Sequence, residues 1–155
     1  MLSPDLFLPL AEKTGLIVPL GDWVIDEACR QLSEWRQQGH MDWTIAVNLS
    51  TLQFEHSALV ETILGTLSRH NVPPEQLILE VTETTAMSNP DESVRVLTEL
   101  SDAGVKASID DFGTGYSSLL YLKRLPACEL KIDRAFVREL GQEGEDARLS
   151  LRLSR

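Results

Sequence analysis

The chain has 155 residues, of which 43% are hydrophobic and 25% are charged, as in an ordinary soluble globular domain. Its formal net charge of −10 argues against sequence-independent binding of DNA or RNA, which needs a basic face that displaces counterions. A phosphate-bearing ligand stays open, because carboxylates can hold divalent cations that contact phosphates. Cys29 and Cys128 lack metal-type spacing, and no apolar stretch reaches the roughly 18 residues of a membrane span. The simplest prediction is a reduced, cytoplasmic setting.

Helices and strands are predicted to alternate along the chain. Apolar residues at helical spacing predict helices over 22–38, where Gly39 is expected to end the helix, and over 57–69. Asn89 followed by Pro90 predicts the start of another helix, which Gly104 ends, and residues 116–124 are also predicted to be helical. Short β-prone runs predict strands at 44–49, 77–82, 106–110 and 129–133. This order favours a parallel sheet with right-handed crossovers, and no repeat or linker divides the chain.

Polar residues recur at the last inward-facing position of each predicted strand. They are Asn48, Glu80, Asp110 and the pair Lys131 and Asp133. The alternate positions are apolar and suit packing beneath helices, because residues two apart in a strand share a face. Carboxyl ends of parallel strands meet at one edge, where α/β folds build their sites. The pattern therefore predicts one shared site.

The chemistry of this set favours a hard cation. Carboxylates with an amide oxygen suit Mg²⁺ or Mn²⁺. Asp110 and Asp111 are adjacent at a strand end and could serve two metals about 3.5–4 Å apart, the arrangement of many phosphoester hydrolases. Two interpretations of Lys131 stay open: a structural ion pair, or a group that orients the nucleophile and neutralises developing charge.

Four ordered motifs carry a family resemblance. They read Asn48-Leu-Ser, Glu80-Val-Thr-Glu83, Asp110-Asp-Phe-Gly-Thr-Gly-Tyr-Ser-Ser118 and Leu130-Lys-Ile-Asp133. Together they resemble the bacterial EAL domain, a cyclic di-GMP phosphodiesterase module, over nearly the whole chain. The resemblance implies an α/β fold, a partial TIM-type (β/α) barrel with at least four consecutive parallel strands. It also implies hydrolysis of cyclic di-GMP to linear pGpG with Mg²⁺ or Mn²⁺.

The same resemblance assigns roles to individual residues. Asn48, Glu80 and Asp110 correspond to ligands of the first metal and Asp111 to a ligand of the second, while Lys131 corresponds to a lysine that contacts the catalytic water. Glu83 corresponds to the residue that anchors the loop after Asp111, a segment tied to dimerisation. Asp133 and Gln53 are further candidates for substrate contact, although Gln53 is also interpreted as a solvated loop glutamine.

The resemblance implies partners as well. Cyclic di-GMP is the expected ligand, a homodimer would form through the loop after Asp111, and no DNA or RNA is expected. A longer protein could also contain GGDEF or sensor domains and a membrane anchor.

Two departures from the family pattern qualify this expectation. The Glu-Ala-Leu segment should precede Leu2, and a segment with Ala-Glu-Gly-Val-Glu should follow Asp146. A TIM barrel typically needs ~250 residues. Residues 1–146 are therefore predicted to be an incomplete EAL-type domain, inactive alone. Residues 147–155 form an atypical tail that alternates with period two, interpreted as frameshifted or disordered. The alternative function is a catalytically silent module that binds cyclic di-GMP or a protein.

Aromatic and histidine side chains give weaker signals. Trp23 and Trp35 are predicted to lie in the core. His40, His56 and His70 lack ligand spacing and are predicted to be surface residues.

Overall fold

A computed structural model describes residues 10, 13–112, 124–126, 129–132 and 150–152 of the chain. These residues form one five-stranded sheet with the strand order β1-β2-β3-β4-β5. Four strands are mutually parallel and β5 runs antiparallel to β4. Their bounds are β1 Ile45–Asn48, β2 Leu77–Thr82, β3 Lys106–Phe112, β4 Glu129–Ile132 and β5 Ser150–Arg152. The predicted run of four consecutive parallel strands is confirmed.

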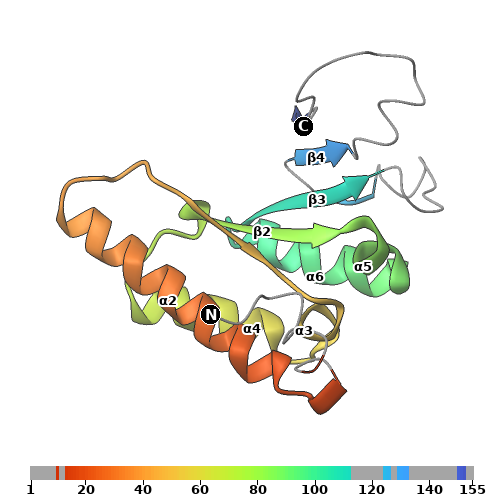
Figure 1. Cartoon of the computed structure of the whole chain (residues 1–155). Helices are drawn as coiled ribbons and strands as arrows, with labels where there is room; N and C mark the ends of the chain where they lie inside the picture. The colour runs from red at the N-terminus through yellow and green to blue at the C-terminus, as the bar shows by residue number, and fades with distance from the viewer. Residues whose placement is uncertain (1–9, 11–12, 113–123, 127–128, 133–149, 153–155) are drawn as a thin grey trace.

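The helices lie on one side of this sheet. Figure 1 shows α2, α4, α5 and α6 on the same side of β2 and β3. Their bounds are α2 Ile17–Gln37, α3 Thr51–Glu55, α4 Leu59–Arg69, α5 Glu83–Ser88 and α6 Pro90–Asp102, with a 3₁₀ turn at Pro74–Gln76. A sheet with helices outside and a second face turned inward is one part of a (β/α) barrel.

The core fills the space between the helices and the outer face of the sheet. Every second residue of β2 is buried, and the odd-numbered residues of β1 and β3 continue this face. The buried apolar strand residues are Val47, Leu77, Leu79, Val81, Ala107 and Ile109. Each large aliphatic side chain buried in this way stabilises the fold by roughly 1.5–3 kcal/mol. The predicted apolar face is confirmed.

Helix α2 begins earlier than predicted, at Ile17 rather than Asp22. The reason is that Ile17 and Gly21 continue the buried stripe of Ile25, Ala28 and Leu32. Beyond the helix, Gly39 adopts a φ of +97°, which favours glycine.

The face of α2 also decides where its tryptophans lie. Trp23 is 61% exposed, so the predicted core position is wrong, because Trp23 lies off the buried stripe. Trp35 packs against the core as predicted.

The three histidines differ in their surroundings. His56 is exposed, as predicted. His40 stacks on Trp43 with ring centroids 3.8 Å apart, and His70 is partly buried against Asp26.

Helix α6 has the signals expected from its sequence. The Asn89 side chain caps it, with Pro90 in the first turn. Gly104 follows it with a φ of +102°, and a Cβ there would come within 2.6 Å of Glu75 Oε1. The positive φ is the condition that favours glycine here, because the exposed Glu75 side chain can move aside.

The remaining predictions fall partly outside the described residues. Of the predicted helix at 116–124, only Arg124 is described, and its guanidinium lies 3.1 Å from Asp91 Oδ1. The described tail residues, 150–152, form β5, which agrees with the period-two alternation of the tail. Among the described residues, no helix is both long and apolar enough to span a membrane.

Candidate functional site

The candidate site begins at the carboxyl ends of β1 and β2. Asn48 is the last residue of β1 and lies in register with Glu80 of β2. The next amide, Leu49 N–H, donates to the Glu80 carbonyl at 2.9 Å. Asn48 is exposed and Glu80 is half-buried, on the face opposite the core. The structure therefore brings these two residues together, as strand parity predicts.

Asp110 of β3 lies on the same face, one pleat further along. Glu80 is in register with Ser108, and Thr82 is in register with Asp110. Asp110 is half-buried, whereas Ser108 is 1% exposed and its hydroxyl has no hydrogen-bond partner among the described residues. The inward face of the sheet thus carries polar side chains at the carboxyl ends of the strands. One pleat before Asp110, the Ser108 side chain is already buried from solvent.

A break in the strand register lies at the two adjacent aspartates. Ile109 pairs with Leu130 and Phe112 pairs with Ile132, with an irregularity between these pairs. Asp110 and Asp111 of β3 therefore stand against Lys131 alone in β4. Two residues opposite one is the definition of a β-bulge, a feature enriched beside active sites.

Glu83 lies directly behind this edge, at the start of α5. Thr82 caps the helix, because its hydroxyl accepts a hydrogen bond from Thr85 N–H at 3.1 Å. The Glu83 side chain is 1% exposed. A carboxylate this deeply buried is held by internal contacts rather than by water, which suits a structural anchor.

Gln53 has an internal role that its sequence position does not reveal. It is 5% exposed, so the interpretation as a solvated loop residue is wrong. Its Oε1 accepts from Ser50 N–H at 3.0 Å and its own N–H donates to Ser50 Oγ at 3.2 Å, a capping box at the start of α3. The predicted substrate contact stays a prediction.

The donor set fits a hard divalent cation. Asn48, Glu80 and Asp110 offer one amide and two carboxylate oxygens from three neighbouring strands. In the described part of the chain, no three His, Cys, Asp or Glu residues are grouped closely enough to hold a metal. A complete site would also include the amide oxygen of Asn48 and the carboxylate of Asp111, a residue of which only the backbone is described. Asp133 and the predicted dimer loop, 113–123, lie outside the described residues.

Two short helices beside the site, α3 and α5, are not predicted from the sequence. Helices α3 and α5 have five and six residues, too few to show a helical period. The signal that could have found α3 is Ser50-x-x-Gln53, the pattern of a capping box.

The family model of the EAL domain matches residues 1–153. The chain belongs to the EAL domain family. It is 62% identical over 147 residues to the bifunctional diguanylate cyclase/cyclic di-GMP phosphodiesterase MucR of Pseudomonas aeruginosa, covering 95% of this chain and 22% of MucR. It is 41% identical over 150 residues to the cyclic di-GMP phosphodiesterase NbdA of the same species, covering 97% of this chain and 19% of NbdA.

The structure agrees with that of a solved EAL domain. It matches the PaMucR phosphodiesterase in complex with c-di-GMP with a TM-score of 0.84 at 63% identity, over 92% of this chain and 57% of that chain. The fold is therefore the α/β, TIM-type barrel fold of EAL domains, as predicted. The chain spans a little over half of that solved EAL chain and about a fifth of the curated relatives.

Proposed function

We propose that this chain is part of a cyclic di-GMP phosphodiesterase domain that hydrolyses cyclic di-GMP to linear pGpG with Mg²⁺ or Mn²⁺. The observation that carries the proposal is the alignment of Asn48, Glu80 and Asp110 on one face at neighbouring strand ends. Membership in the EAL family and the printed activities of MucR and NbdA support it.

Each residue of the proposed site has a distinct task. Asn48, Glu80 and Asp110 would hold the first cation, and Asp111 the second. Such cations, when bound, supply Lewis-acid stabilisation of the phosphoryl oxygens and lower the pKa of water. Lys131, opposite the bulge, would orient the attacking water and offset negative charge on phosphorus-bound oxygens.

The remaining assignments concern support and substrate. Glu83 would anchor the loop after Asp111, and Asp133 would contact the nucleotide. We also propose a homodimer formed through that loop. GGDEF or sensor domains in a longer protein are supported by the bifunctional name of MucR. A cytoplasmic location is supported by the buried free thiol of Cys29.

A second candidate is a catalytically silent module that binds cyclic di-GMP or a protein. The chain spans 57% of the solved EAL chain, so a site built from this part alone would lack the ligands of the remaining strands. In that case the retained polar residues would serve binding alone.

A hybrid domain tests the proposal. Residues 2–146 of this chain replace their counterparts in the MucR phosphodiesterase domain, a graft that their 63% identity makes structurally conservative. Glu80→Gln and Asp110→Asn keep the side-chain shape but remove the charge that holds a cation. Each should lower the Mn²⁺-dependent rate by at least about 100-fold, more than the loss typical of outer-shell partners.

The readout is chromatography of linear pGpG across a Mn²⁺ series. Glu61→Gln, an exposed glutamate of α4, is the matched control and should leave the rate unchanged. Full turnover by Glu80→Gln would remove Glu80 from the site. An unsubstituted hybrid that binds cyclic di-GMP without hydrolysing it would favour the silent module.

A further inference from the structure

Three threonine hydroxyls form a chain of hydrogen bonds behind the candidate ligands. The Thr82 hydroxyl donates to Thr85 Oγ1 at 3.0 Å, and Thr85 Oγ1 lies 2.7 Å from Thr51 Oγ1. The Thr85 hydroxyl thus bonds both neighbours, because it accepts from Thr82 and can donate to or accept from Thr51. Thr85 is 2% exposed, so water does not compete for these bonds.

The two ends of this chain lie beside the predicted ligands. Thr51 is the first residue of α3, in the connection that leaves β1 directly after Asn48. Thr82 is the last residue of β2, on the same strand face as Glu80, and is in register with Asp110. The hydroxyl chain therefore joins the connection that follows β1 to the carboxyl end of β2.

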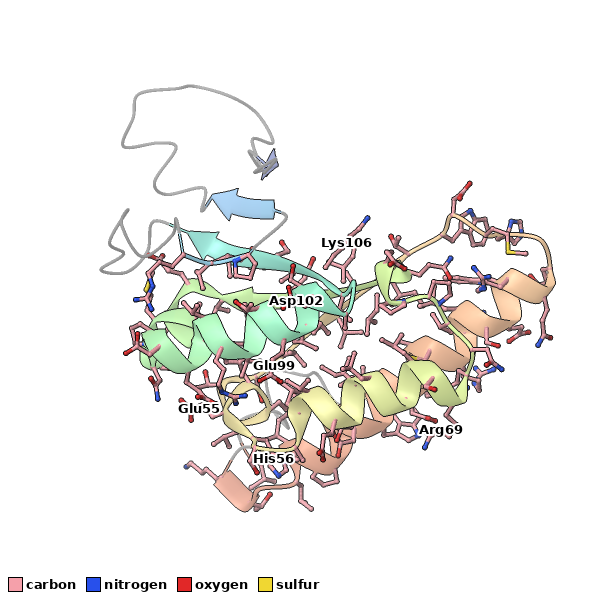
Figure 2. All side chains as sticks on the ribbon, turned by 180° about the vertical axis from the view of Figure 1, so that it is seen from behind. Glu55, His56, Arg69, Glu99, Asp102 and Lys106 are labelled. Carbon is pink, nitrogen blue, oxygen red and sulfur yellow. The ribbon has the colours of Figure 1, made fainter. Side chains whose placement is uncertain are left out.

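Helix α3 depends on such bonds for its position. It has only five residues, and helices shorter than roughly 12–15 residues are marginal without tertiary contacts. At its other end, Ser88 Oγ of α5 donates to Glu55 Oε1 at 3.1 Å, and Figure 2 shows Glu55 where α3 approaches α5. Two side-chain bonds, one at each end, thus hold α3 against α5.

We propose that Thr85 is a positioning residue whose hydroxyl fixes the connection after β1 against the end of β2. In this role Thr85 sets the separation of Asn48 from Glu80 and Asp110 without touching substrate or cation. The cation-binding consequence rests on the proposed function, whereas the mechanical link does not.

Hydrogen exchange in the 155-residue chain tests the link. Thr85→Val removes the hydroxyl and keeps the shape of the side chain, and Thr85→Ser keeps the hydroxyl. In Thr85→Val, the Gln53 and Phe54 amides of α3 should exchange roughly three- to tenfold faster, the factor expected for one net hydrogen bond. Thr85→Ser should restore the slow exchange.

The matched control is Thr66→Val. Thr66 is also buried, but its hydroxyl donates to the Thr62 carbonyl at 2.6 Å within α4, away from α3. Thr51→Val removes the same Thr51–Thr85 hydrogen bond by changing its exposed partner. This variant tests the proposed link if Thr85→Val does not fold. Wild-type exchange of the α3 amides in Thr51→Val and Thr85→Val, or equal acceleration in Thr66→Val, would overturn the inference.

The MucR hybrid tests the consequence for the site. Thr85→Val should raise the Mn²⁺ concentration that gives half the maximal rate by about tenfold, the lower end for outer-shell partners, and Thr85→Ser should reverse this shift. An unchanged Mn²⁺ requirement in an active hybrid contradicts the inference. An unsubstituted hybrid without hydrolysis contradicts the proposed function instead, and hydrogen exchange then decides the inference alone.

Discussion

Asp26, in the middle of α2, holds the end of α4 through contacts with Arg69 and His70. Its Oδ1 accepts hydrogen bonds from the Arg69 guanidinium and from His70 Nε2, the latter at 2.9 Å. The hydrogen bond with His70, followed by the hydrogen bond and charge of Arg69, holds the pKa of the Asp26 carboxyl below its usual value. Burial opposes this and raises the pKa of the neighbouring Cys29 thiol to about 11.

This cluster predicts a stability difference that depends on pH. A carboxyl whose pKa is lowered by folding stabilises the protein above its unfolded pKa of about 3.9 and loses that contribution as pH falls through the folded pKa. Asp26→Asn should therefore lower the free energy of unfolding by about 0.5–1 kcal/mol at pH 7, a value reduced for partial exposure. Below the folded pKa, the two proteins should be equally stable.

Urea unfolding between pH 2 and 8, followed by tryptophan fluorescence, measures this difference. Asp22→Asn is the control, because Asp22 is an exposed carboxyl on the same helix, and its effect should stay within about 0.5 kcal/mol. A deficit in Asp26→Asn that persists at the lowest pH would show that the carboxylate charge is not the cause.

At the scale of elements, the crossing of α2 and α3 depends on a glycine. A Cβ on Gly21 would overlap the side-chain amide nitrogen of Gln53. Gln53 cannot easily withdraw, because it is buried and its Oε1 is held by the capping box of α3. The close approach therefore connects α2 directly to the connection that follows Asn48.

Gly21→Ala should accordingly destabilise the chain by about 1–3 kcal/mol through overpacking, despite the better helix propensity of alanine. Gly65→Ala in α4 is a matched control, since a Cβ there meets nothing within 4 Å. It should stabilise the chain by about 0.5–1 kcal/mol.

The double variant Gly21→Ala with Gln53→Ala gives a sharper check by thermal or urea unfolding. Its loss should be smaller than the sum of the two single losses, because truncating Gln53 removes the clash. Additive losses would mean that the glycine is required for another reason.

The sequence predicts some of these elements better than others. Strand β2 is found with its correct bounds because Pro73 and Pro74 stop any preceding helix and the alternating pattern follows at once. Helices α3 and α5 are missed because single turns have no period, and their positions depend on Thr51, Thr85 and Gln53 contacts that only the tertiary structure creates.

One part of the candidate site can be predicted from the sequence and another part cannot. Strand parity predicts that Asn48, Glu80 and Asp110 share a face, since alternation is a local property of a strand. The bulge that sets Asp110 and Asp111 against Lys131 is a mismatch between two strands, so β3 alone does not reveal it.

At the scale of the whole molecule, the described strands form an open sheet. Among the described residues, β1 pairs only with β2, and β5 pairs only with β4. An unpaired edge is a template for pairing with another chain. Several large apolar side chains of α2 and its surroundings are also exposed, among them Leu16, Trp23 and Leu52.

These two features predict that the 155-residue chain, studied alone, associates and hydrolyses cyclic di-GMP negligibly. Association follows because β1 has only one neighbour among the described strands, and because the exposed apolar side chains offer area that favours contact with another chain. Inactivity follows separately, since losing ligands weakens cation binding. Light scattering gives the association state, and chromatography after long incubation with Mn²⁺ gives the product. A monodisperse monomer that turns over cyclic di-GMP as fast as the MucR hybrid would contradict both parts of this prediction.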